Sequence, residues 1–243
     1  MDSQMSGKQE QLAANIAQVR SNIAEAAGRA GRTAEEIMLI AVSKTKPVEL
    51  VKIAYNLGVT DFGENRVQEA LPKLAEFHPQ GMRWHMIGHL QTNKAGKVVG
   101  TFDAVQSVDS LHLAQTLNRH AEEHGIRLPV LLQVNVADEE SKEGVTLAEA
   151  PRLARQIVEL PAIEVQGLMT IAPLVKDPEE VRFVFRDLRN LRERLQQELP
   201  GCSWQHLSMG MTDDYKVAIE EGATIVRIGR AIFGERVNKG VSQ

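Results

Sequence analysis

The chain alternates between two patterns of apolar and polar residues. In the first pattern a short run is almost wholly apolar, as in residues 37–42, which read Ile-Met-Leu-Ile-Ala-Val. Such runs are typical of strands that are buried on both faces of a parallel sheet. In the second pattern apolar residues recur every three or four positions over a longer stretch, as they do within residues 8–30. That spacing predicts amphipathic helices, so strands and helices are expected to alternate along the chain.

Eight strands are predicted, and a helix is predicted after each of them. The strands cover residues 37–44, 60–64, 83–88, 104–108, 129–136, 163–171, 204–209 and 224–228. The helices cover residues 8–30 in front of the first strand and then 47–58, 65–77, a stretch from 92, 110–125, 147–160, 178–199, 213–221 and a short segment from 230. Eight strand–helix units in 243 residues predict an α/β fold, a single (β/α)8 TIM barrel with an extra N-terminal helix.

An open, doubly wound parallel sheet is the alternative fold. It is disfavoured because no Gly-x-Gly-x-x-Gly follows the first strand, as a dinucleotide-binding fold would require. No linker rich in Pro, Gly or Ser divides the sequence. We therefore expect one domain that spans residues 1–243.

Charge and cysteine content narrow the class of protein. The formal net charge is −4, which argues against a nucleic-acid binder with a basic face. Cys202 is the single cysteine, so no internal disulfide can form, as is usual in a reducing cytoplasm. The N-terminus lacks a signal-peptide pattern, and no apolar run approaches the length of a membrane span. The expectation is a cytoplasmic protein that binds neither nucleic acid nor membranes.

Lys44 stands at the end of the first predicted strand, on the same face as Ile40 and Val42. A desolvated lysine has a depressed pKa, and its free amine can attack a carbonyl carbon. The alternative is a lysine that simply extends into solvent.

The last two strand ends suggest a phosphate site. In a barrel the functional residues gather where strands end, and the loops after strands seven and eight often bind phosphate. Ser208, Gly210 and Gly229 suit that role, because glycine lets the backbone approach an anion and serine adds a donor. Two ordinary tight turns are the alternative.

Arg227 shares a strand face with Ile225 and needs an acceptor if it is buried. Its partner could be an internal carboxylate such as Glu64, or an aromatic ring nitrogen or oxyanion of a ligand.

An amine, a phosphate cradle and an arginine together indicate a phosphorylated aldehyde held as a Schiff base. Pyridoxal 5′-phosphate (PLP) fits all three groups, and a sugar phosphate on a Schiff-base aldolase is the alternative. His85 and His89 lie four residues apart, but no further His or Cys stands at a helpful spacing. We therefore predict no metal site.

Five motifs resemble the YggS/PROSC family of pyridoxal phosphate homeostasis proteins, over about residues 12–236. They read Ala41-Val-Ser-Lys-Thr-Lys-Pro47, Phe62-Gly-Glu-Asn65, Trp84-His-Met-Ile-Gly-His-Leu-Gln91 with Asn93-Lys94, Leu207-Ser-Met-Gly-Met-Thr-Asp213 and Arg227-Ile-Gly229. The resemblance implies a barrel like the N-terminal domain of alanine racemase, with PLP as the cofactor.

The resemblance also assigns roles to single residues. Lys44 would form the Schiff base, Arg227 would face the pyridine nitrogen, and Asn65 would lie beside the cofactor. The phosphate would be held by Ser208, Gly210, Gly229 and the backbone of Arg230. Arg230 departs from the Thr or Ser that many members have there, and Met86 departs from their Phe or Leu.

We expect no efficient catalysis. PLP withdraws electrons best when its ring nitrogen is protonated, and Arg227 would disfavour that proton. The related racemases also use a tyrosine from an additional domain, which this sequence lacks. The resemblance implies a monomeric protein that buffers PLP or delivers it to PLP-dependent apoenzymes. A slow PLP-dependent amino-acid racemase or lyase is the alternative function.

Overall fold

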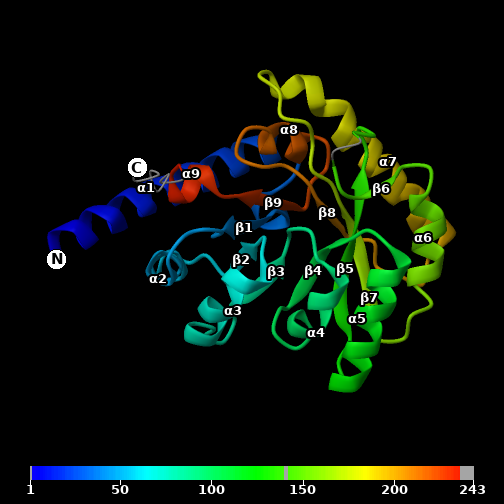
Figure 1. Cartoon of the computed structure of the whole chain (residues 1–243). Helices are drawn as coiled ribbons and strands as arrows, with labels where there is room; N and C mark the ends of the chain where they lie inside the picture. The colour runs from blue at the N-terminus through cyan, green and yellow to red at the C-terminus, as the bar shows by residue number, and fades with distance from the viewer. Residues whose placement is uncertain (1, 140–141, 236–243) are drawn as a thin grey trace, which may run out of the picture.

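The computed structural model describes residues 2–139 and 142–235, and eight parallel strands within them close into a barrel (Figure 1). The barrel strands are β1 (Met38–Val42), β2 (Asp61–Glu64), β3 (Arg83–Met86), β4 (Ala104–Val108), β5 (Leu128–Asn135), β7 (Ile163–Met169), β8 (His206–Ser208) and β9 (Ile225–Ile228). Each strand pairs in parallel with the next along the chain, and β1 pairs with β9, which closes the ring. The predicted (β/α)8 barrel is confirmed.

Helices surround the barrel. They are α1 (Asp2–Arg29), α2 (Val48–Asn56), α3 (Val67–Glu76), α4 (Ala95–Val98), α5 (Leu111–His124), α6 (Ala150–Ile157), α7 (Arg182–Glu198), α8 (Tyr215–Glu220) and α9 (Arg230–Phe233). Short 3-10 turns precede α4 and α7, at Thr92–Lys94 and Pro178–Val181, and a third, Ala34–Glu36, lies between α1 and β1. None of the helices in the described ranges has the length and apolar character that crossing a bilayer requires.

The N-terminal helix α1 is longer than its apolar pattern predicts, because its first residues are polar and carry no stripe. Its apolar stripe, which includes Leu12, Ile16 and Val19, is buried against the body of the protein. The helix lies beside α8 and α9 (Figure 1), where Asn15 donates to the carbonyl of Ile232 and Asn22 donates to the hydroxyl of Tyr215. The extra helix therefore braces the last two units of the barrel.

One short strand was not predicted. β6 (Val145–Thr146) pairs in parallel with the end of β5 and lies between the predicted strand 129–136 and the predicted helix 147–160. The following helix begins at Ala150 instead of residue 147, with Pro151 in its first turn, where proline is well tolerated. Two residues are too few to give a strand pattern, so the sequence could not reveal β6.

The core has two parts, as expected when a barrel is wrapped in helices. Most buried apolar side chains pack between the outer face of the sheet and the helices. A smaller cluster of Ile40, Leu131, Met169 and Ile225 fills the inside of the barrel. The alternation of side chains along β1 sends Ile40 inward and Ala41 outward.

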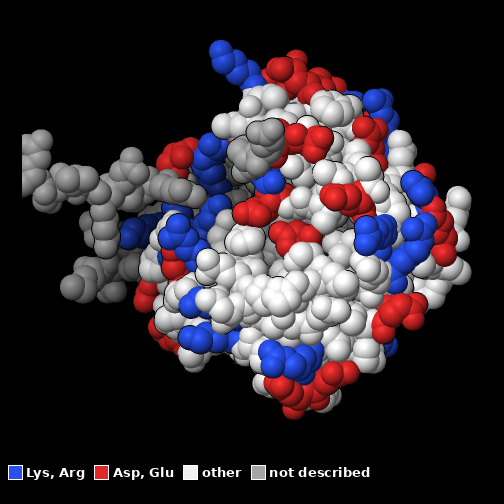
Figure 2. All heavy atoms as spheres, turned by 45° about the vertical axis from the view of Figure 1, so that its right-hand side comes forward, with Lys and Arg blue, Asp and Glu red and all other residues white. Residues whose placement is uncertain are grey.

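The surface carries both signs of charge. Figure 2 shows Lys and Arg interspersed with Asp and Glu over the face in view, with no large area of one sign.

Candidate functional site

A cavity of about 570 Å³ opens at the mouth of the barrel where the strands end, here called the carboxyl mouth. Five of the seven predicted site residues line it, namely Lys44, Asn65, Arg227, Gly229 and Arg230. They come from the ends of β1, β2 and β9, which are neighbours in the sheet. Ser208 and Gly210 do not line the cavity, and Thr212 does.

Lys44 lies in a turn that is held by side chains on the outer side of the barrel. β1 ends at Val42, two residues earlier than predicted, and Thr45 adopts a left-handed φ of 64°. The Ser43 hydroxyl donates to Glu64 at 2.7 Å, and Lys73 of α3 donates to the Ser43 carbonyl at 2.8 Å. The position of Lys44 therefore depends on side chains outside the barrel.

Glu64 and Lys73 form the centre of that support. Lys73 Nζ lies 2.7 Å from Glu64 Oε1, and Glu64 is fully buried. Glu64 lies on the outer face of β2, toward α3, so it is not the internal partner of Arg227 that the sequence left open. A buried carboxylate is tolerated when a cation and hydrogen bonds compensate it. Here both contacts reach Oε1, and Oε2 is buried without a hydrogen-bond partner among the described residues.

Arg227 is buried on the inner face of β9, as its alternation with Ile225 predicts. Its guanidinium donates to the Ser208 hydroxyl at 2.6 Å and to the Thr170 carbonyl at 2.7 Å. Burial lowers the pKa of Arg227 to about 10, against the opposing charge of Asp214. The group therefore remains a cation at neutral pH, held in one orientation at the floor of the cavity.

A line of buried hydrogen bonds continues from Arg227 through the inside of the barrel. The Ser208 hydroxyl donates to Gln106 Oε1 at 2.6 Å. The Gln106 amide nitrogen lies 3.2 Å from His85 Nδ1, and His85 Nε2 lies 2.9 Å from Asp61 Oδ1. These partners require Nδ1 to accept and Nε2 to donate, so one imidazole tautomer satisfies the whole line.

The side chain of Ser208 lies inside the barrel, beside Arg227. Its hydroxyl faces inward because residues 206 and 208 lie on the inner face of β8. It holds the guanidinium of Arg227 and does not reach the cavity lining.

Gly210 shapes the turn after β8. Its φ is +94°, and a Cβ there would lie 2.7 Å from Ala218 Cβ and 2.8 Å from Tyr215 Cα. Only glycine fits this conformation so close to α8. The turn brings Thr212 to the cavity, where its hydroxyl lies 3.4 Å from the backbone nitrogen of Ala231. Thr212 is the hydroxyl group that the sequence reasoning missed, although the quoted motif contains it.

Arg230 and Lys46 hold the last helix at the cavity. The guanidinium of Arg230 is paired with Asp213 and lies 3.4 Å from Glu235 Oε1. Lys46 Nζ donates to the carbonyls of Phe233, Gly234 and Glu235 at 2.9, 3.0 and 2.9 Å. Both cationic side chains already bind groups of the protein, so backbone N–H groups would bind an anion at this turn.

Asn65 is positioned by a glycine from the next unit. A Cβ on Gly88 would lie 2.3 Å from the Asn65 carbonyl oxygen, so no other residue could pack there.

His85 and His89, four residues apart in the sequence, lie in different parts of the structure. His85 is inside the barrel, and the more exposed His89 lies beyond the end of β3.

The comparisons with known proteins identify the family of the chain. The family described as alanine racemase, N-terminal domain, matches residues 14–237. A pyridoxal phosphate homeostasis protein of Aquifex aeolicus (strain VF5) is 45% identical over 221 residues, which cover 91% of this chain and 96% of that protein. The protein of the same name in Escherichia coli (strain K12) is 44% identical over 231 residues, covering 93% of this chain and 97% of that protein.

Solved structures are similar to this chain over most of its length. A protein of unknown function from Bifidobacterium adolescentis superimposes with a TM-score of 0.86 at 40% identity, covering 93% of this chain and 96% of that one. PipY of Synechococcus elongatus PCC7942, solved with PLP bound, gives 0.81 at 38% identity, covering 92% and 100%. Alanine racemase from Corynebacterium glutamicum, at 17% identity and 0.70, shares the fold over 96% of this chain and 63% of its own length. The chain therefore belongs to the family of pyridoxal phosphate homeostasis proteins, whose barrel is that of the alanine racemase N-terminal domain.

Proposed function

We propose that this protein binds PLP for cofactor homeostasis, with the aldehyde held by Lys44 as a Schiff base. The observation that carries the proposal is that Lys44, Arg227 and the Gly229–Arg230 turn all line one cavity. Its volume of about 570 Å³ is within the range of about 300–1,000 Å³ that is usual for cofactor sites. The relatives' shared name and the PLP-bound PipY support the same ligand.

The donor set fits PLP group by group. Lys44 offers a primary amine to an aldehyde, and Arg227 offers an N–H donor to the ring nitrogen. Gly229 and the backbone of Arg230 open helix α9, where backbone N–H groups suit a phosphate. Thr212 adds a hydroxyl, and Asn65 would lie beside the ring. Ser208 and Gly210 act behind this surface, the first by orienting Arg227 and the second by shaping the turn.

We propose storage or delivery rather than turnover. When bound, PLP supplies a ring that accepts electrons, most strongly with its nitrogen protonated. Arg227 is a buried cation and a donor only, so it disfavours that proton. Neither tyrosine of the chain can act as the opposite acid or base, because Tyr55 donates to the Gln80 carbonyl and Tyr215 contacts Asn22, both away from the cavity. PLP-dependent apoenzymes are the recipients that this role implies.

The test is the visible absorbance of the purified protein after PLP is added and excess is removed. A Schiff-base band is expected for the parent and absent from Lys44→Ala. Lys97→Ala, at an exposed position of α4, is the matched control and should keep the band. A band that survives in Lys44→Ala contradicts the assignment of the amine.

A slow racemase or lyase is the second candidate, because the fold is shared with alanine racemases. Incubating the PLP-loaded protein with each amino acid, while following optical rotation and keto-acid release, distinguishes the two. We expect no turnover above the Lys44→Ala background. Turnover that depends on Lys44 would favour the enzyme.

A further inference from the structure

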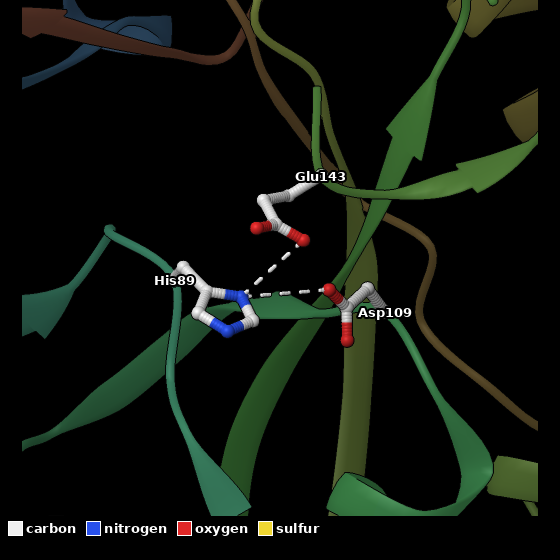
Figure 3. Close-up of side chains that lie close together, drawn as sticks. All are labelled: His89, Asp109 and Glu143. Atoms are coloured by element: carbon white, nitrogen blue, oxygen red, sulfur yellow. Dashed lines mark ion pairs between the residues drawn. The ribbon is translucent and has the colours of Figure 1, made fainter. Parts of the chain in front are cut away.

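Three side chains from three successive barrel units meet beside the carboxyl mouth. His89 follows β3, Asp109 follows β4, and Glu143 follows β5, and we call these residues the rim cluster. Figure 3 shows the imidazole of His89 facing both carboxylates. Because β3, β4 and β5 are neighbours in the sheet, the loops at their carboxyl ends bring these distant residues together.

The distances suit a shared cation. His89 Nδ1 lies 3.5 Å from Glu143 Oε2 and 3.9 Å from Asp109 Oδ2, and the three ligand atoms lie within 4.8 Å of one another. Bonds of about 2.0–2.2 Å to a tetrahedral zinc ion place its ligand atoms about 3.3–3.5 Å apart. Side-chain movements of less than about 1 Å would close the cluster around such an ion.

The charges of the rim cluster also favour a cation. Within the described ranges, neither Asp109 nor Glu143 forms an ion pair with a lysine or arginine. Two carboxylates are thus held together with only a weakly basic imidazole between them, and a divalent ion would relieve their repulsion.

We infer that the rim cluster is a binding site for a first-row divalent metal ion of the zinc type. One imidazole nitrogen and two carboxylate oxygens form a donor set for zinc, cobalt or manganese, whereas calcium and magnesium prefer oxygen alone. The side chains of His89 and Glu143 are 46% and 56% exposed, so the remaining coordination position faces water. Asp109 and Glu143 were not predicted as ligands, because only further His and Cys residues were expected to complete a site with His85 and His89.

The test is titration of the full-length protein with Co²⁺, followed by its visible ligand-field absorbance, and with Zn²⁺ by calorimetry. The parent should bind one ion per chain, and His89→Ala or Glu143→Gln should bind at least tenfold more weakly. His120→Ala is the matched control, because His120 contacts a single carboxylate, Glu123, at 2.8 Å. It should bind like the parent.

Lys44→Ala separates this site from PLP, which can itself bind metal ions. It should bind one ion with the parent's affinity, whether or not the proposed cofactor role is correct. No saturable binding by the parent, or equal binding by His89→Ala, would overturn the inference.

Discussion

The two mouths of the barrel differ in what their charged groups do. The mouth at the start of the strands, the amino mouth, has the larger cavity, about 750 Å³ against about 570 Å³ at the carboxyl mouth. Its basic side chains are used to hold the fold together. Arg20 donates to the carbonyls of Leu57 and Gly58, Arg32 donates to that of Ala223, and Arg83 is paired with Asp61.

The carboxyl mouth joins groups of different chemistry instead. An amine from the end of β1 meets a buried guanidinium and a glycine turn from β9 there, and the smaller cavity is the better candidate for a cofactor. Volume alone would have selected the amino mouth. A candidate site is therefore identified better by the groups that line a cavity than by its volume. Lining groups that already hold the fold together are less available to a ligand.

The two mouths are joined by the hydrogen-bonded line from Arg227 to Asp61. Each bond in it is buried, and its ends carry opposite charge.

The largest effect is expected from Lys73→Ala. It leaves the carboxylate of Glu64 buried without its cation, which typically costs about 3–5 kcal/mol of folding free energy. Urea unfolding measures the loss. Lys52→Ala removes the exposed pair with Glu76 and serves as the control, with a loss of at most about 1 kcal/mol. Equal losses in the two variants would contradict the support role of Glu64 and Lys73.

Ser208→Ala should come next. It removes two buried hydrogen bonds, one of them to a charged group, so we expect a loss of about 2–3 kcal/mol and weaker PLP retention. Ser107→Ala is a close control, because the Ser107 hydroxyl is buried beside Gln106 without a partner in the described structure. Ser208→Thr keeps the hydroxyl and should restore part of the PLP retention. PLP release is followed by the loss of visible absorbance on dialysis.

Asp61 should make stability depend on pH at the amino mouth. Burial opposes its ionisation, but hydrogen bonds from His85 and Arg83 outweigh burial and lower its pKa to about 2. Because the unfolded value is about 3.9, the carboxylate stabilises the fold above about pH 4, and that stability is lost as the pH falls toward 2. Its size is about 2 kcal/mol. The difference in urea midpoint between the parent and Asp61→Asn should therefore be larger at pH 5 than at pH 2.5.

The smallest effect is expected from Arg230→Ala. Its pairs with Asp213 and Glu235 are exposed, and such pairs contribute about 0–1 kcal/mol. PLP affinity should change by less than tenfold if the backbone, and not this side chain, meets the phosphate. A larger loss of affinity, measured by fluorescence titration, would assign the side chain to the ligand.

The sequence predicted those features that depend on local periodicity. Runs such as residues 37–42 identified the strands, and the alternation of side chains correctly placed Ile40 and Arg227 inside the barrel. The end of β1 led to Lys44, which lines the cavity. The roles of the seven predicted cofactor residues remain predictions.

Features that depend on distant contacts could not be predicted in the same way. The pair of Glu64 with Lys73 and the line from Ser208 to His85 join different strands and helices, which no local pattern records. Thr212 was missed because a left-handed turn at Gly210 redirects the chain after β8. The rim cluster was not predicted, because its three residues lie in separate loops that only the fold brings together.

The pairing of β1 with β9 has a consequence for the newly made protein. Lys44 is synthesised early, yet Arg227 and the turn at Gly229 emerge only near the end of translation. One edge of β1 stays unpaired until residues 225–228 have been synthesised. A nascent chain therefore cannot complete the cavity that Lys44 lines before almost all of the barrel has left the ribosome.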